Sequence, residues 1–161
     1  MKHALFAAIF SIGVIQATHG LSLDVGGIEL SLGQDVSEAI NSLSGYQVTY
    51  HDGLGWVVQQ NLGNQVWSLG HFSAVANKIV YISKSFNDRE ATAETYTRAS
   101  KELHARGGNA CTLKEIEYSD GKIHSFNTSC GAYLLRYSMP SYWRPGELSQ
   151  GSIDLSLKGR P

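Results

Sequence analysis

The two cysteines of the chain, Cys111 and Cys130, stand at equal distances from the dipeptide Asp120-Gly121. Asp-Gly between two β-prone runs is a strong signal for a two-residue hairpin, because a type I′ turn needs positive φ angles that these residues tolerate. Each cysteine lies nine residues from the turn, so the two should face one another on one side of the sheet. We predict a structural Cys111–Cys130 disulfide that contributes about 3 kcal/mol in the chain-entropy model.

The first twenty residues have the three parts of a secretory signal peptide. Lys2 supplies a positive charge, residues 4–15 form an almost unbroken apolar run, and small residues follow. An apolar helix of that length spans about 18 Å, short of the roughly 30 Å of a bilayer core, so a membrane anchor is disfavoured. We expect cleavage after Ala17 or Gly20 and a secreted or periplasmic mature chain without a transmembrane anchor, where a disulfide is stable.

Composition limits the class of protein. The chain has 161 residues, of which 42% are hydrophobic and 17% charged, as in one globular domain that needs no metal to hold its core. A formal net charge of -1 argues against nucleic-acid binding, which requires a basic face to neutralise phosphates. We expect residues 1–20 to be a signal peptide and residues 21–161 to be a single secreted domain.

Apolar periodicity along the mature chain indicates a helix followed by an antiparallel meander, twice. Asp35 is placed to cap a helix over residues 36–43, and β-prone runs follow at 46–51, 56–60, 65–72 and 78–86. A longer helix is predicted from about residue 89 to 105, stopped by Gly107, with further strands at 110–119, 122–129, 132–139 and 152–158. The predicted fold class is α+β, with helices packed on antiparallel meander sheet. Its units, 28–86 and 87–158, fit both an internal repeat and a chance recurrence of one hairpin pattern.

The first of these helices carries a family resemblance. Residues 32–40, Leu-Gly-Gln-Asp-Val-Ser-Glu-Ala-Ile, with Leu43 and Gly45, resemble the helix-opening motif of the SmpA-like outer-membrane assembly lipoproteins and the beta-lactamase inhibitory proteins. The resemblance covers residues 28–84 by motif and the second half by element order. It implies a helical segment packed on an antiparallel sheet, in tandem for the inhibitors, and a role as a protein-binding inhibitor or as an accessory structural subunit of a cell-envelope assembly. The lipoprotein cysteine is missing here, and only the second unit has a cysteine pair.

Sequence motifs for catalysis or metal binding are absent from the mature chain. Four histidines, at positions 51, 71, 104 and 124, fall in different predicted elements and at no tight ligand spacing. Neither a Gly-x-Ser-x-Gly elbow nor a Gly-rich phosphate loop occurs. Glu117 and His124, three residues on either side of the hairpin turn, are expected to pair across the strands. We predict no catalytic residue, metal or cofactor, and keep a small hydrolase using His and Asp residues as an alternative.

Aromatic residues are the remaining candidates for a site, because Tyr, Trp and Arg are enriched at binding hot spots. They crowd the first meander and the loop at 139–146, and strict alternation would put Trp67 and His71 on one face of the same strand. We predict a non-enzymatic module that binds a protein partner through an aromatic sheet face and this loop. The candidate binding residues are Tyr50, Trp56, Trp67, Tyr142, Trp143 and Arg144. The alternative for the loop is that Trp143 plugs one end of the core.

Overall fold

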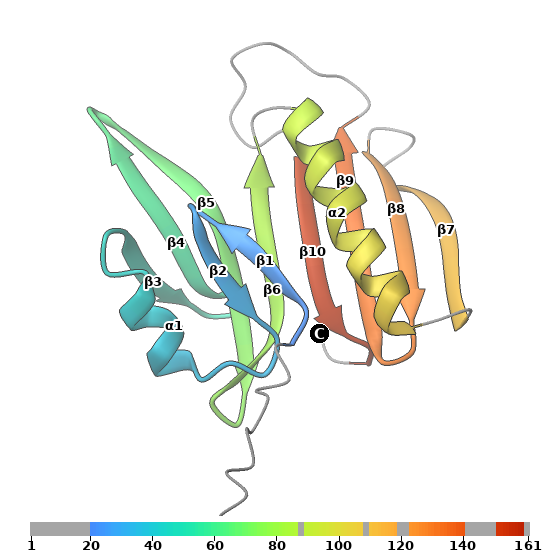
Figure 1. Cartoon of the computed structure of the whole chain (residues 1–161). Coiled ribbons are helices and arrows are strands. Elements are labelled where there is room, and N and C mark those ends of the chain that lie inside the picture. The colour runs from blue at the N-terminus through green and yellow to red at the C-terminus, as the bar shows by residue number, and fades with distance from the viewer. Residues whose placement is uncertain (1–19, 87–88, 108–109, 119–122, 141–150, 160–161) are drawn as a thin grey trace, which may run out of the picture.

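A computed structural model of the chain describes residues 20–86, 89–107, 110–118, 123–140 and 151–159. Two helices and ten strands are found in these ranges (Figure 1). The first half contains β1 (Ser22–Val25), β2 (Ile28–Ser31), α1 (Val36–Ser42), β3 (Gln47–His51), β4 (Gly55–Leu62), β5 (Gln65–Val75) and β6 (Lys78–Phe86). The second half contains α2 (Arg89–Gly107), β7 (Cys111–Tyr118), β8 (Ile123–Cys130), β9 (Tyr133–Pro140) and β10 (Gly151–Leu157).

One antiparallel sheet of eight strands dominates the described part of the chain. Its order is β3-β4-β5-β6-β10-β9-β8-β7, so each half forms a four-stranded meander and the last strands of the two meanders pair with each other. The β1-β2 hairpin is a separate two-stranded sheet. The chain is therefore an α+β protein with a sheet-dominated fold, which confirms the predicted class at that level.

The layers of the molecule are asymmetric. Figure 1 shows α1, the β1-β2 hairpin and α2 on the same side of the eight-stranded sheet. The apolar core lies between these elements and the sheet, and it includes Leu30, Phe72, Ile82, Leu103 and Leu155. We call the side of the sheet that carries Phe72, Ile82 and Leu155 the core face, and the opposite side the open face.

Local chemistry explains how α1 and the hairpin of the second half form. The carboxylate of Asp35 accepts hydrogen bonds from the backbone N–H and the hydroxyl of Ser37, as the predicted N-cap should, and these bonds lower the pKa of Asp35. Cys111 faces Cys130 in the register of β7 and β8, and their sulfurs form a disulfide, which confirms the predicted pairing. Glu117 likewise faces His124, with 3.6 Å between its Oε1 and the imidazole Nδ1. The turn residues Asp120 and Gly121 lie outside the described residues.

A β-bulge in the first meander corrects the predicted side-chain alternation. Val57 faces His71 and Val58 faces Gly70, but Gln59 faces Ser68, so β5 has one extra residue at this point. The extra residue reverses the alternation, and Trp67 and His71 consequently lie on opposite faces of the sheet rather than on one. Gly70 takes a φ of 153° there, and a Cβ atom at this position would come within 2.1 Å of the Ser83 carbonyl oxygen.

The β1-β2 hairpin and helix α2 cover the core face of the sheet (Figure 1). The β1-β2 hairpin, which the sequence patterns did not predict, places Leu23, Val25 and Leu30 in the core. Helix α2 contacts β6, β8, β9 and β10, and it ends at the predicted Gly107. Within the described ranges, neither helix combines the length and the apolar character that crossing a bilayer requires.

Candidate functional site

A row of polar side chains crosses the open face. His71 on β5 faces Ser83 on β6, Ser83 faces Asp154 on β10, and Asp154 faces Arg136 on β9. Residues directly opposite each other in an antiparallel sheet point to the same side. Their chain neighbours Phe72, Ile82 and Leu155 are buried in the core, so this polar row points away from it.

Asp154 and Ser83 form the centre of the polar row. The Ser83 hydroxyl donates a hydrogen bond of 2.7 Å to Oδ1 of Asp154, and the two residues are only 3% and 8% exposed. Burying a carboxylate costs free energy unless a donor compensates it, and the Ser83 hydroxyl provides that compensation. The pair therefore places a fixed negative charge under the middle of the open face.

Two rings adjoin this charge. The His71 and Tyr81 rings lie 5.3 Å apart between centroids at an angle of 38°. Burial, opposed by the charge of Asp154, lowers the pKa of His71, while burial and then that same charge raise the pKa of Tyr81. His71 is consequently neutral and Tyr81 keeps its proton at neutral pH, so both side chains can donate and accept hydrogen bonds without carrying charge.

The two rings also line a hollow at the start of β4. Its volume is about 600 Å³, and its walls include Tyr50, Trp56, His71, Tyr81 and Gly55. The Tyr50 and Trp56 rings meet edge to face with centroids 5.1 Å apart, and Trp56 stacks in turn on the buried Phe72. Tyr50 is 58% exposed, so the hollow has one rigid aromatic wall anchored in the core and one aromatic rim that solvent reaches.

Polar atoms without partners mark the other end of the polar row. Nε of Arg136 and Oδ1 of Asn127 are buried, and neither has a hydrogen-bond partner among the described residues. The two residues face each other on β9 and β8. Leaving such groups unpaired inside a protein costs free energy.

The geometry does not form a nucleophilic triad, although serine, histidine and aspartate are neighbours here. In a triad the serine hydroxyl donates to the imidazole and the imidazole donates to the carboxylate. Here the Ser83 hydroxyl donates to Asp154 instead, and Ser83 is nearly inaccessible. The chemistry that this arrangement supports is recognition through hydrogen bonds and aromatic contact.

The residues predicted from the sequence divide into three groups. Tyr50 and Trp56 come together in the hollow. Trp67 lies elsewhere on β5, with its indole Nε1 buried and without a hydrogen-bond partner among the described residues. Tyr142, Trp143 and Arg144 lie outside the described residues, so the binding role of the loop at 139–146 stays a prediction.

The sequence patterns missed the polar row as a site. Part of the polar row could have been predicted from the sequence, because Ser152, Asp154 and Ser156 alternate with apolar residues along β10. Nothing local shows that β10 inserts beside β6, whose residues lie about seventy positions earlier in the chain. The cluster of Ser83 and Asp154 depends on that distant pairing.

Comparison of the chain with protein-family models, with curated protein sequences and with solved structures finds no match.

Proposed function

We propose that this chain is an exported, non-enzymatic module that binds a protein partner on its open face, in the manner of an inhibitor. The observation that carries the proposal is the aromatic hollow beside a polar face that no described helix or strand covers (Figure 1). Hot spots of protein interfaces have this composition, an aromatic pocket for an anchor side chain with a polar surround. By register, Tyr50 and Trp56 belong to the core face and His71 and Tyr81 to the open face, so the hollow spans the sheet at the start of β4. The partner would insert an apolar or aromatic side chain into the hollow and extend from there over the open face.

The surroundings of the hollow favour a protein over a small isolated ligand. Its volume lies within the range of about 300–1,000 Å³ of small-molecule pockets. It does not end as a closed pocket, however, because exposed Tyr50 and Leu54 form its rim and the polar row continues from His71 toward Arg136. A partner with an extended surface can contact the hollow and Arg136 together.

Export rests on two features of the chain. Residues 1–20 have the pattern of a signal peptide, and the Cys111–Cys130 disulfide is compatible with an oxidising compartment. We expect fractionation to find the protein outside the cytoplasm, and mass measurement to find cleavage after Ala17 or Gly20. Full-length protein in the cytoplasmic fraction would contradict this part of the proposal.

We also infer that the two halves are tandem units of one helix-plus-meander design. Each meander places its first strand, β3 or β7, at an outer edge of the eight-stranded sheet and its last strand, β6 or β10, at the centre. This order supports the resemblance to the tandem inhibitors, which remains a proposal. In this arrangement both units contribute to one continuous open face.

The binding proposal is tested with two matched variants. Tyr50 and Leu113 are exposed to 58% and 67% and lie on the two opposite edge strands, β3 and β7. The mature chain is immobilised, incubated with the extracellular and envelope proteins of its host, and the bound protein is identified and its affinity measured. We expect Tyr50→Ala to weaken binding at least tenfold with an unchanged melting temperature, and Leu113→Ala to have no effect.

Two results would contradict the proposal. Equal loss of affinity in the Leu113→Ala and Tyr50→Ala variants would mean that the captured protein does not use the hollow. Substrate turnover that is lost in a His71→Gln variant would favour the hydrolase alternative instead.

A further inference from the structure

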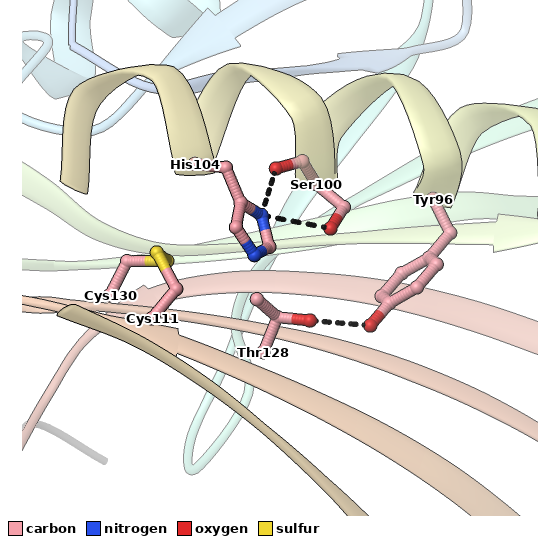
Figure 2. Close-up of a disulfide and its surroundings, with 6 residues drawn as sticks. All are labelled: Tyr96, Ser100, His104, Cys111, Thr128 and Cys130. Carbon is pink, nitrogen blue, oxygen red and sulfur yellow. Dashed lines mark hydrogen bonds between the residues drawn. A yellow bond between two sulfur atoms is a disulfide. The ribbon is translucent and has the colours of Figure 1, made fainter. Parts of the chain in front are cut away.

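The surroundings of the disulfide contain a third side chain with metal-binding chemistry. His104, on the last turns of α2, lies next to Cys111 and Cys130, and one of its ring nitrogens and the two sulfurs lie within 4.8 Å of one another. Figure 2 shows the imidazole between the helix and the strands that carry the cysteines. His104 is exposed, Cys111 is half-buried and Cys130 is buried, so the cluster opens to solvent on the histidine side.

A hydrogen bond determines which imidazole nitrogen is free. Nδ1 of His104 lies 2.7 Å from the Ser100 carbonyl oxygen, one helical turn earlier. A carbonyl oxygen only accepts, so Nδ1 must carry the proton, and in the neutral ring the lone pair is on Nε2. Histidines that bind metals in proteins are held in the same way, with the other ring N–H donated to a backbone carbonyl or carboxylate.

We propose that reduction of the disulfide converts Cys111, Cys130 and His104 into a three-ligand site for a thiophilic cation such as Zn²⁺. A dithiol reductant transfers two electrons and two protons to the disulfide, giving two cysteine thiols and the oxidised reductant. Binding of Zn²⁺ then releases the two thiol protons, and the metal is held by two thiolates and Nε2. Two thiolates and an imidazole are a donor set that zinc prefers, with water able to take the fourth position.

The distances are compatible with such a site after small movements. Typical Zn–S and Zn–N bonds of about 2.3 and 2.0 Å at tetrahedral angles separate the ligand atoms by roughly 3.6 Å. The three ligand atoms already lie within 4.8 Å of one another, so the remaining adjustment is about 1 Å. The cysteines come from directly facing positions, so freed sulfurs stay near each other.

The fold around the cluster does not depend on the disulfide alone. The Tyr96 and Thr128 hydroxyls join α2 to β8 at 2.7 Å, as Figure 2 shows, and Leu103 of α2 is fully buried. The antiparallel ladder between β7 and β8 has eight residue pairs, and the two cysteines form the first of them. The reduced protein should therefore keep His104 above the two thiols. This site is separate from the open face and does not rest on the proposed binding function.

The test uses the mature chain reduced with a phosphine under anaerobic conditions and titrated with Co²⁺, whose absorption reports thiolate ligation. We expect one Co²⁺ per chain, displaced by Zn²⁺, and no binding by the oxidised protein. His104→Ala retains both cysteines and should weaken binding at least tenfold, because loss of an outer-shell partner alone typically costs about 10–100-fold. His51→Ala, which removes an exposed histidine on β3, is the matched control and should bind as the wild type does.

Two results would overturn the site: no thiolate-to-cobalt absorption in the reduced wild type, or equal affinity in the His104→Ala variant. If the reduced chain unfolds, the titration is followed by near-ultraviolet circular dichroism instead. Metal must then restore the native spectrum at a concentration at least tenfold lower in the wild type than in His104→Ala, since binding and folding are coupled. Failure to restore it overturns the proposal as well.

Discussion

Gly70 shows how one residue determines which side chains share a face. Gly70 lies at the bulge that puts Trp67 and His71 on opposite faces of the sheet. Its φ is 153°, and its backbone lies close to the Ser83 carbonyl oxygen. An L-residue rarely adopts this φ angle, and a Cβ atom would collide with backbone rather than with a movable side chain. The position of His71 beside Tyr81 therefore depends on a residue that has no side chain.

The Gly70→Ala substitution should destabilise the protein by more than about 1 kcal/mol, because both the φ angle and the available space disfavour a methyl group. Gly45→Ala is the control, since a Cβ there meets nothing within 4 Å. Urea unfolding measures both variants. Equal stability of Gly70→Ala and the wild type would show that β5 can shift its register without cost.

The lowered pKa of His71 predicts a pH dependence of stability. The unfolded chain, with an ordinary histidine pKa of 6.5, binds a proton more readily than the folded chain does. The stabilisation is thus complete above pH 6.5 and is lost as the pH falls from there through the folded-state pKa. His71→Gln should flatten this part of the stability profile. Parallel profiles of the wild type and His71→Gln would refute the assignment.

Arg136 should matter for binding and not for folding. Its Nε is buried without a partner among the described residues, so removing the side chain relieves an unsatisfied donor. We expect Arg136→Ala to leave the free energy of unfolding unchanged or higher while it weakens the captured partner's binding. Arg98→Ala, at an exposed position on α2, is the control for loss of one positive charge. A large loss of stability in Arg136→Ala would mean that the guanidinium supports the fold.

At the scale of elements, the β7-β8 hairpin is the part that local sequence specifies best. Its turn signal, its two cysteines and the Glu117–His124 pair all predict one register, and the structure has that register. The sequence patterns did not predict the β1-β2 hairpin, because each of its strands has only four residues and so shows too short an alternation of apolar and polar side chains. Short elements of this kind form because they bury Leu23, Val25 and Leu30 against the sheet.

Loss of the disulfide should lower the free energy of unfolding, by an amount that grows with the logarithm of the length of the closed loop. The cysteines lie 19 positions apart in the sequence, and a loop of that length corresponds to about 3 kcal/mol in the chain-entropy model. We expect the Cys111→Ala, Cys130→Ala double variant and the reduced wild type to show the same loss by urea unfolding without metal. A double variant as stable as the oxidised wild type would show that the ladder already restricts the unfolded hairpin.

At the scale of the whole molecule, the seam between β6 and β10 makes one sheet from two meanders. Leu155 on β10 faces Ile82 on β6 and Leu135 on β9, and all three are at most 2% exposed. Among the described residues, one apolar core cluster draws its members from both halves of the chain, so we expect the two halves to unfold together. The open face is continuous because of the same seam.

Leu155→Ala should therefore lower the stability of both halves together, by about 2–5 kcal/mol as for other buried leucines. Hydrogen exchange measures this directly, because amides of β4 and of β8 should lose protection by the same amount. Leu113→Ala, 67% exposed on β7, should change neither. Loss of protection in only one meander would show that the units fold independently.

The sequence by itself determined the local elements: the Asp35 cap, the strand runs, the end of α2 at Gly107 and the cysteine pairing. These follow from interactions between residues that are close along the chain, where propensity and turn chemistry act. Only the tertiary structure decided the composition of the candidate sites. The meeting of Ser83 with Asp154, of His71 with Tyr81 across the bulge, and of His104 with the disulfide depends on strand order and helix docking. Those are set by burial of the whole core, which no local pattern records.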